Sequence, residues 1–303
     1  MMYGLSRDEM HDLLTLRDWR SWCSLATNWG LIVLAFAMVA WWPNPLAVVL
    51  ALLTIGARQL GLAVLMHEAA HRTLLKNRQW NDWVGNWLCA YPIWSDLSPY
   101  RPYHLKHHAK NWTAEDPDLA LATPFPVSRS SMWRKVWRDL NGQTGFKRAK
   151  ATLRRDLGRS EGRVKRNFDA GRESLRPVML TNAILFGILA ASGHPWLYLV
   201  WIGAWLTTYS LVMRVRSIAE HAMIPDPADE LGNSRTTVAR WWERLFIAPN
   251  YVNYHLEHHL LMTVPHYNLP RMHRLLQARG QLEQACVVRG YPAVVRLAAS
   301  QAA

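Results

Sequence analysis

The sequence predicts an all-α integral membrane protein with four transmembrane helices in two hairpins and a cytoplasmic helical cap. Apolar residues make up 50% of the 303 residues, and they gather into long runs with the charged residues between them. A helix needs about 20 consecutive apolar residues to cross a bilayer, so runs of this kind are typical of membrane proteins. Three cysteines, Cys23, Cys89 and Cys286, lack CxxC spacing, which excludes a disulfide framework and makes thiolate binding of a metal unexpected.

We interpret the whole chain, 1–303, as one domain. Its first part, residues 1–24, is polar and amphipathic, and we expect a surface helix with Trp19 and Trp22 at the membrane interface. This part is not a signal peptide, because no basic region leads directly into a short apolar run with a small-residue cleavage site.

The first hairpin is predicted over residues 25–66. Its two apolar runs cover 25–42 and 46–66, and a turn rich in Trp and Pro separates them. Arg58 and Gln59 interrupt the second run, and polar groups inside a span usually face the protein interior or a water-filled cavity. The second run leads without a break into the first histidine pair.

Residues 67–176 are predicted to be cytoplasmic. Residues 80–98 are rich in Trp but broken by Asn, Asp and Pro, which indicates an interfacial or re-entrant segment. Residues 129–176 are strongly basic, and basic loops favour the cytoplasmic side of a membrane. We call the following residues the basic set: Arg134, Lys135, Arg138, Lys147, Arg148, Lys150, Arg154, Arg155, Arg159, Arg163, Lys165, Arg166 and Arg172.

The second hairpin is predicted over residues 177–213, with apolar runs at 178–191 and 196–213 around a tight turn. Residues 214–303 are expected to form the cytoplasmic cap. With a cytoplasmic amino terminus, each hairpin returns the chain to the cytoplasm just before a histidine, so all histidine clusters lie on one face of the membrane. We expect that membrane to be a bacterial inner membrane.

The net charge of +13 bears on the choice of partners. The basic residues flank the apolar runs, which suits contact with anionic lipid headgroups better than contact with nucleic acid. We therefore expect membrane lipids as partners and no nucleic acid.

Histidines give the strongest functional signal. Eight of the 13 form one HxxxH pair and two HxxHH clusters, and offsets of three and four residues share one face of a helix. These eight are His67, His71, His104, His107, His108, His255, His258 and His259.

Neutral imidazole is the commonest protein ligand for transition metals, and a set made only of histidines suits Fe, Zn or Cu. One ion rarely needs more than four or five histidines, so eight predict two ions. Glu68, Glu220 and Glu257 each adjoin a candidate ligand in sequence. Because adjacent side chains diverge on a helix, we expect these carboxylates either to orient imidazoles of other clusters or to be ordinary solvated glutamates.

Two other kinds of protein are compatible with part of this pattern. His67-Glu68-Ala69-Ala70-His71 matches the HExxH motif of zinc peptidases, in which the glutamate is the general base. An intramembrane zinc protease needs only one further protein ligand, however, and six histidines would remain unexplained. A metal carrier or transporter would need ligands within the membrane depth, whereas these clusters are predicted at its cytoplasmic edge.

The three clusters, at the cytoplasmic ends of four spans, resemble those of the membrane fatty acid desaturase superfamily, which also contains acyl hydroxylases and carotenoid ketolases. The resemblance covers about residues 25–275. The stretch Asn253-Tyr254-His255-Leu256-Glu257-His258-His259-Leu260, followed by Pro265-His266-Tyr267-Asn268-Leu269-Pro270, is similar to the carboxy-terminal signature of the fatty acid desaturase branch. The first cluster departs from the HxxxxH of many acyl-CoA desaturases, which leaves the substrate open.

The resemblance implies two iron ions with about nine ligands, the ninth lying between the fourth span and the last cluster. His221 is the histidine in that interval. It also implies that O2 and two electrons serve to remove hydrogen from an unactivated C–H bond of an acyl lipid. The product is then a C=C bond or, in a hydroxylase or ketolase, an oxygenated carbon.

No GxGxxG motif is present, and we expect electrons from a separate carrier. This donor is expected to be of the ferredoxin or cytochrome b5 type with its own reductase, and an acidic ferredoxin would suit the basic cytoplasmic face.

Four histidines are not expected to bind the metals. His194 follows the third span and should lie across the bilayer, about 30 Å from the clusters. His11 lies in the amino-terminal helix without a partner histidine. His266 follows Pro265, outside the helical register of the last cluster, so it is expected beside the ligands or at the mouth of the substrate site. His273 is cytoplasmic and close in sequence to the last cluster.

Overall fold

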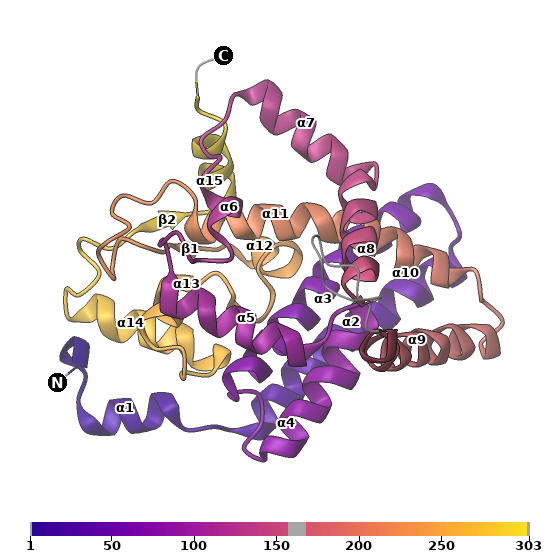
Figure 1. Ribbon diagram of the computed structural model, residues 1–303, viewed down its shortest axis with the longest axis horizontal. Helices are drawn as coiled ribbons and strands as arrows, with labels where there is room; N and C mark the ends of the chain where they lie inside the picture. Colours follow the sequence, from indigo (N-terminus) through magenta and orange to yellow (C-terminus); the bar gives the residue numbers. More distant parts are fainter. Residues whose placement is uncertain (1, 157–167, 302–303) are drawn as a thin grey trace.

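A computed structural model describes residues 2–156 and 168–301 of the chain, and helices form most of it (Figure 1). The α-helices are α1 (Arg7–Leu14), α2 (Asp18–Trp41), α3 (Pro45–His71), α4 (Arg78–Val84), α5 (Leu97–Lys110), α6 (Leu119–Ala122), α7 (Arg129–Leu140), α8 (Gln143–Asp156), α9 (Phe168–Ala191), α10 (Leu197–Leu206), α11 (Thr208–His221), α12 (Trp241–Phe246), α13 (His255–Leu260), α14 (Leu269–Ala278) and α15 (Tyr291–Ala298). Shorter 3₁₀ or π-helical segments are η1 (Met2–Gly4), η2 (Gly85–Ala90), η3 (Tyr91–Ile93), η4 (Pro249–Tyr251) and η5 (His266–Asn268).

Three helices within the described ranges are long and apolar enough to cross a membrane: α2, α3 and, within α9, residues Glu173–Ala191. The first two form the predicted first hairpin. α2 begins at Asp18, earlier than the apolar run, because the polar residues before the run continue the same helix. The predicted amino-terminal surface helix is therefore only α1. Trp19 and Trp22 lie in the first turns of α2, where they are 61% and 43% exposed.

The fourth apolar run forms two helices, α10 and α11, which meet at Thr207. Thr207 has φ −110° and ψ −85°, outside the helical range. Its hydroxyl donates a hydrogen bond to the carbonyl of Gly203 at 2.6 Å, and such bonds to the i−4 carbonyl often bend helices. The structure therefore does not have the single fourth spanning helix that the sequence predicted. Hydropathy detects the apolar run but not a local break in the backbone.

α3 is the central helix, and its neighbours include α2, α5, α10 and α11. Arg58 and Gln59 are 4% and 0% exposed. The Gln59 amide donates to the carbonyl of Trp201 at 3.1 Å, and the Arg58 guanidinium donates to the carbonyl of Leu245. Both polar groups in this span thus face the protein interior, as predicted.

Arg101 fastens α5 to the end of α3. Its Nη2 donates to the carbonyl of Ala69 at 2.9 Å and its Nε donates to that of Ala70 at 3.1 Å. Carbonyls at the end of a helix lack partners within it, and a guanidinium there also suits the helix dipole. Since Arg101 lies three residues before His104, this contact sets the histidine-bearing parts of the two helices side by side.

A small second core holds α13 between α1 and α14. It contains Leu13 of α1, Leu256 and Leu260 of α13, and Met272 and Leu276 of α14, all of them buried. Burial of these apolar side chains fixes the orientation of α13, whose other face carries histidines.

One small parallel sheet departs from the all-α prediction. β1 (Thr236–Val238) pairs with β2 (Val287–Arg289), and Thr236 also forms an isolated bridge with Tyr254, just before α13. Strands of three residues are too short to show an alternating pattern, so the sequence could not reveal them.

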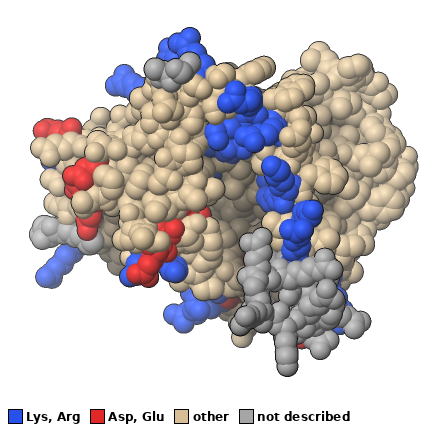
Figure 2. Space-filling view, turned by 45° about the horizontal axis from the view of Figure 1, so that its top comes forward, with Lys and Arg blue, Asp and Glu red and all other residues tan. Residues whose placement is uncertain are grey.

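Charged side chains are scarce on one side of the molecule. A wide region on the right of Figure 2, the side where α9 and α10 lie in Figure 1, shows almost no blue or red atoms. The candidate spans and α10 expose large apolar side chains, among them Val33, Leu34, Leu46, Val49, Leu50, Ile184, Ile188 and Leu199. Large exposed apolar surfaces mark contact sites, and here they suit contact with lipid chains.

The basic set does not form one uniform surface. Arg148 is half-buried rather than free: its Nη2 donates to the carbonyl of Trp205 at 2.6 Å, and its guanidinium stacks on the rings of Trp205 and Tyr209. This contact fastens α8 to the junction of α10 and α11. Four members of the set lie outside the described residues: Arg159, Arg163, Lys165 and Arg166.

Candidate metal centre

Four helices converge at the end of α3 and bring nine histidines together. The nine are His67 and His71 of α3, His104, His107 and His108 of α5, His221 of α11, and His255, His258 and His259 of α13. They divide into a group of five, formed by His67, His71, His104, His108 and His258, and a group of four, formed by His107, His221, His255 and His259. Within each group, the ligand atoms lie within 4.8 Å of one another.

The division follows helix geometry. In each HxxHH stretch, the two histidines four residues apart join one group, and the middle histidine joins the other. His104 and His108 thus belong to the group of five, whereas His107 belongs to the group of four. Positions i and i+4 lie above one another on a helix, while i+3 is displaced to the side. One HxxHH helix can therefore serve two sites.

The Nε2 atoms point toward a common centre in each group. In the group of five, the His104 Nε2 lies 2.9 Å from that of His71 and 3.0 Å from that of His108. In the group of four, the Nε2 of His221 lies 3.2 Å from that of His107 and 2.8 Å from that of His255. The Nε2 atoms of His67 and His259 are buried and have no hydrogen-bond partner among the described residues.

This arrangement fits a bound cation in each group. A neutral imidazole has one N–H, so a ring of converging Nε2 atoms cannot be satisfied by hydrogen bonds alone. Burial, followed by the neighbouring imidazoles, holds the pKa of His104, His258 and His259 well below the usual value, so these rings are neutral. Neutral imidazole is the form that binds transition metals, and a cation is the partner that the inward lone pairs require.

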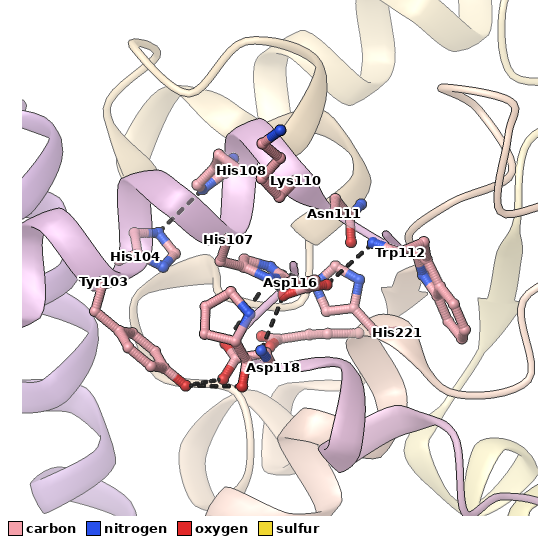
Figure 3. Close-up of polar contacts among 12 residues, drawn as sticks. Tyr103, His104, His107, His108, Lys110, Asn111, Trp112, Asp116, Asp118 and His221 are labelled. Carbon is pink, nitrogen blue, oxygen red and sulfur yellow. Dashed lines mark hydrogen bonds and ion pairs between the residues drawn. The ribbon is translucent and has the colours of Figure 1, made fainter. Parts of the chain in front are cut away.

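Asp116 holds His107 from the side away from the metal group (Figure 3). Its Oδ1 lies 2.8 Å from the His107 Nδ1, which must donate, and its Oδ2 accepts from the backbone of Trp112 at 3.0 Å. Burial opposes ionisation of Asp116, but these hydrogen bonds outweigh burial and hold its pKa below the usual value. A carboxylate on Nδ1 fixes the tautomer that leaves Nε2 free for a metal.

The sequence did not identify Asp116, because no helical spacing links a residue in a turn to His107. The sequence signal that could have pointed to Asp116 was the group of carboxylates Glu115, Asp116 and Asp118 in the polar turn after the first HxxHH. The backbone carbonyl of Asn233, which lies 3.4 Å from the Nδ1 of His221, was equally invisible, since any residue has a carbonyl.

The three predicted glutamates behave differently. Glu220 lies 3.5 Å from the Nδ1 of His255, which is an imidazole of another cluster but is beyond the usual hydrogen-bond distance. Glu68 lies 3.6 Å from the Nδ1 of His67, too far for a hydrogen bond, and accepts from the backbone N–H of His266 at 2.9 Å.

Glu257 does not meet a predicted ligand. It accepts from the hydroxyl of Thr236, and its Oε1 lies 2.5 Å from the Nδ1 of His273. Its expected role in orienting a ligand imidazole is therefore wrong in this geometry, because Glu257 projects from α13 away from the neighbouring histidines toward β1 and α14.

The remaining histidines lie outside both groups. His194 belongs to the turn between α9 and α10, where its Nδ1 donates to the carbonyl of Ser192 at 2.9 Å. His11 is exposed on α1. His266 is buried beside the metal centre, where its Nε2 lies 2.9 Å from the hydroxyl of Ser24 and its Nδ1 lies 3.4 Å from Glu68.

The geometry does not favour a zinc peptidase. In that class, two histidines of HExxH and one further residue bind a single zinc, and the glutamate faces bound water. Here, His67 and His71 share their group with three other imidazoles. Glu68 instead accepts from the hydroxyl of Thr73 at 3.0 Å and from the backbone of His266.

A cavity of about 250 Å³ adjoins both groups. His104 of the group of five lines it, together with His107, His221 and His255 of the group of four. Residues of α3, α5, α6 and α11 complete the wall. A substrate in this cavity would therefore lie next to both candidate metal positions.

Comparisons with known proteins agree with this centre. The family model described as "Fatty acid desaturase" matches residues 43–291, a range that includes all nine histidines. The dihydrorhizobitoxine desaturase of Bradyrhizobium elkanii is 30% identical over 252 residues, which cover 80% of this chain and 70% of that protein. An sn-1 oleoyl-lipid 12-desaturase of Anabaena variabilis is 25% identical over 260 residues, which cover 79% of this chain and 70% of that protein.

A shorter similarity concerns an oxygenating enzyme. Beta-carotene 4-ketolase 3 of Haematococcus lacustris is 36% identical over 86 residues, which cover 24% of this chain and 26% of that protein.

Proposed function

The chain belongs to the fatty acid desaturase family, and from this premise we propose that it is an O2-dependent two-iron membrane enzyme that introduces a C=C bond into a fatty-acyl or related lipid chain. The observation that carries the proposal is the division of nine histidines into groups of five and four beside one cavity. Each group offers enough imidazole nitrogens for one iron ion.

When bound, the two irons supply the activation of O2 and the oxidation of the substrate C–H bonds, which side chains cannot perform. The protein supplies the positions of the groups. Asp116 and the carbonyl of Asn233 hold the Nδ1–H groups of His107 and His221, so that both Nε2 atoms face inward. The cavity orients the substrate beside both groups, and burial of the histidines limits the access of water.

The membrane arrangement is part of the proposal. We take α2 and α3 as the first hairpin, and α9 with α10 and the first part of α11 as the second, so that the break at Thr207 lies within the fourth crossing. We assign the histidine centre to the cytoplasmic face of a bacterial inner membrane, because the basic residues of 129–176 favour that side by the positive-inside rule.

Two electrons are needed for each turnover. A ferredoxin-type or cytochrome b5-type donor with its reductase is the proposed source. The exposed members of the basic set, such as Arg134 and Arg154, support docking of an acidic partner on this face.

A hydroxylase or ketolase of the same superfamily is the second candidate, and the short similarity to a carotenoid ketolase favours it. Small differences in the position of the substrate decide between removal of a second hydrogen and return of oxygen. Mass analysis separates the two products: desaturation removes two hydrogens, and hydroxylation adds one oxygen.

The test is reconstitution of the purified protein in membranes with iron, ferredoxin, ferredoxin reductase, NADPH and candidate acyl lipids. We expect about two irons per chain and an O2-dependent product two mass units lighter than the substrate. A protein that holds one zinc and no iron would overturn the proposal, and so would an iron-loaded protein that consumes no O2 with any acyl lipid or any free acid, long or short.

A further inference from the structure

Among the described residues that line the 250 Å³ cavity, Arg216 is the only lysine or arginine. It lies on α11, one turn before Glu220 and His221, and its side chain is 16% exposed. A guanidinium in so enclosed a place needs partners, because desolvation of a charged group is costly unless the group is paired.

Only one side of the Arg216 guanidinium is paired. Its Nε donates to the Oε1 of Glu220 at 2.5 Å. No other hydrogen bond of Arg216 occurs within residues 2–156 and 168–301, so the two Nη nitrogens keep their donors for another group. The planar fork of a guanidinium matches the two oxygens of a carboxylate or similar anion.

Four residues of the cavity wall have hydroxyls that make no hydrogen bond with the described part of the chain, namely Ser95, Tyr100, Tyr209 and Ser217. The ring of Tyr100 stacks on His104 with centroids 5.3 Å apart, and Ser217 follows Arg216 in the chain. Apolar side chains, including those of Met66, Leu121 and Met213, form much of the remaining wall. The cavity thus combines an apolar part with a cluster of free donors.

The negative groups of the cavity are already engaged. Glu220 accepts from Arg216, and Asp118 accepts from the hydroxyl of Tyr103 at 2.5 Å. With a cation in each histidine group, as the proposed function requires, the histidine-lined side of the cavity is positive as well. An anionic oxygen group is therefore compatible with both sides of the cavity.

The size of the cavity restricts the length of its ligand. Pockets that enclose drug-sized molecules measure about 300 to 1,000 Å³, and this one is smaller. Because Arg216 and both histidine groups lie on the wall of this one small cavity, only a short part of a ligand fits between its anionic end and the carbons that react.

We propose that this cavity selects a short substrate with an anionic oxygen group, such as a carboxylate, which Arg216 binds through its Nη nitrogens a few bonds away from the carbons that react. The proposal rests on the proposed function and narrows its substrate class from long acyl lipids to short acids. Tyr100 and Ser217 donate to the same group. Arg216 is then a substrate-binding residue that determines specificity.

Binding is measured first, without turnover. The iron-loaded protein in nanodiscs is kept free of O2, and equilibrium dialysis gives the Kd of radiolabelled hexanoate and of hexan-1-ol, with empty nanodiscs as the blank. The two probes share a chain and differ in the charged end. We expect hexanoate to bind about 10- to 100-fold more tightly than the alcohol, the effect of a charge-assisted hydrogen bond.

Three variants assign the preference to Arg216. Arg216→Met should remove it, while Arg216→Lys should retain part of it, because a lysine keeps the charge but not the fork. Glu220→Gln should bind hexanoate at least as tightly as the unchanged protein, because it leaves the Nη nitrogens free and removes a competing negative charge. Iron content measured on each variant shows whether the centre has kept its structure.

Equal Kd values for hexanoate in the unchanged protein and in Arg216→Met, at equal iron content, would overturn the inference. So would turnover of oleoyl lipids with a KM that Arg216→Met does not change, and this result would leave the proposed desaturase function intact. Conversely, binding of hexanoate that depends on Arg216, in a protein that desaturates nothing, would support the site and overturn the proposed function.

Discussion

The Nδ1 of His107 lies 2.8 Å from the Oδ1 of Asp116, while the Nε2 of the same ring lies 3.2 Å from the Nε2 of His221. One imidazole is therefore held by a carboxylate on one side and offers its other nitrogen to the group of four.

Asp116→Ala should weaken metal binding in that group by about 10- to 100-fold, the usual effect of losing such a partner. Competition with a chelator, followed by metal analysis, measures this loss.

The matched control for Asp116 is Glu115→Gln. Glu115 adjoins Asp116 but is exposed, and within the described part of the chain it forms an ion pair only with Lys110, at 3.3 Å. We expect this variant to retain its metal at the same chelator concentration as the unchanged protein. Equal retention of metal by Asp116→Ala would show that Asp116 does not support the centre.

The sequence predicted those parts of the site that depend on local geometry. The three clusters lie on helices α3, α5 and α13, because offsets of three and four residues identify a shared face without knowledge of the fold. The sequence could not predict how the nine histidines divide into two groups. His104 of α5 shares its group with His258 of α13, whereas His107 of α5 shares the other group with His259 of α13. Such pairing depends on how α5 and α13 meet, which only the packed structure determines.

The membrane helices were predictable to a similar degree. Apolar length located α2, α3 and α9, but the break at Thr207 depends on the hydroxyl bond to Gly203, which hydropathy does not register. The contacts of Glu257 with Thr236 and His273 were also invisible, because they depend on the position of α13 against β1 and α14.

The proposed topology predicts that Asn44 and His194 face the outside and that Lys150 faces the cytoplasm. Single cysteines at these positions, in a chain with serine at Cys23, Cys89 and Cys286, are treated with a membrane-impermeant maleimide on intact cells. Cysteines at 44 and 194 should react, and a cysteine at 150 should react only after permeabilisation. Labelling at 150 but not at 194 on intact cells would show that the protein has the opposite orientation in the membrane.

The proposed docking face predicts that Arg154→Glu combined with Arg155→Glu slows reduction by an acidic ferredoxin and lowers its dependence on salt. Charge reversal removes the long-range attraction that speeds encounter of oppositely charged partners, and salt screens only charges that contribute. Stopped-flow reduction at several ionic strengths measures both effects. Unchanged rates would favour contact of these residues with lipid headgroups instead.

Asp139 of α7 joins this helix to α11 and should contribute to stability. It is 0% exposed, and its two oxygens accept from the Nε and Nη2 of Arg214 at 2.5 and 2.7 Å. Asp139→Asn leaves Arg214 without its counter-charge, which should cost about 2 to 3 kcal/mol of unfolding free energy and lower the Tm by about 5 °C. Thermal unfolding in detergent measures the shift, with exposed Asp229→Asn as the control. Equal Tm values for the two variants would contradict this role.

The final prediction concerns the metal ligands themselves. Single alanine substitutions at nine positions should lower bound iron and abolish turnover: His67, His71, His104, His107, His108, His221, His255, His258 and His259. Each removes one converging Nε2 atom from a group of four or five, and the remaining imidazoles cannot reach across to replace it. The same substitution at His194 or His11, which lie outside both groups, should leave iron at about two per chain.

His221 provides the most specific test, because it belongs to no HxxxH or HxxHH cluster, yet its Nε2 lies 2.8 Å from that of His255. If His221→Ala kept full iron and full activity, the group of four would need only three histidines, and His221 would have to be removed from the ligand set.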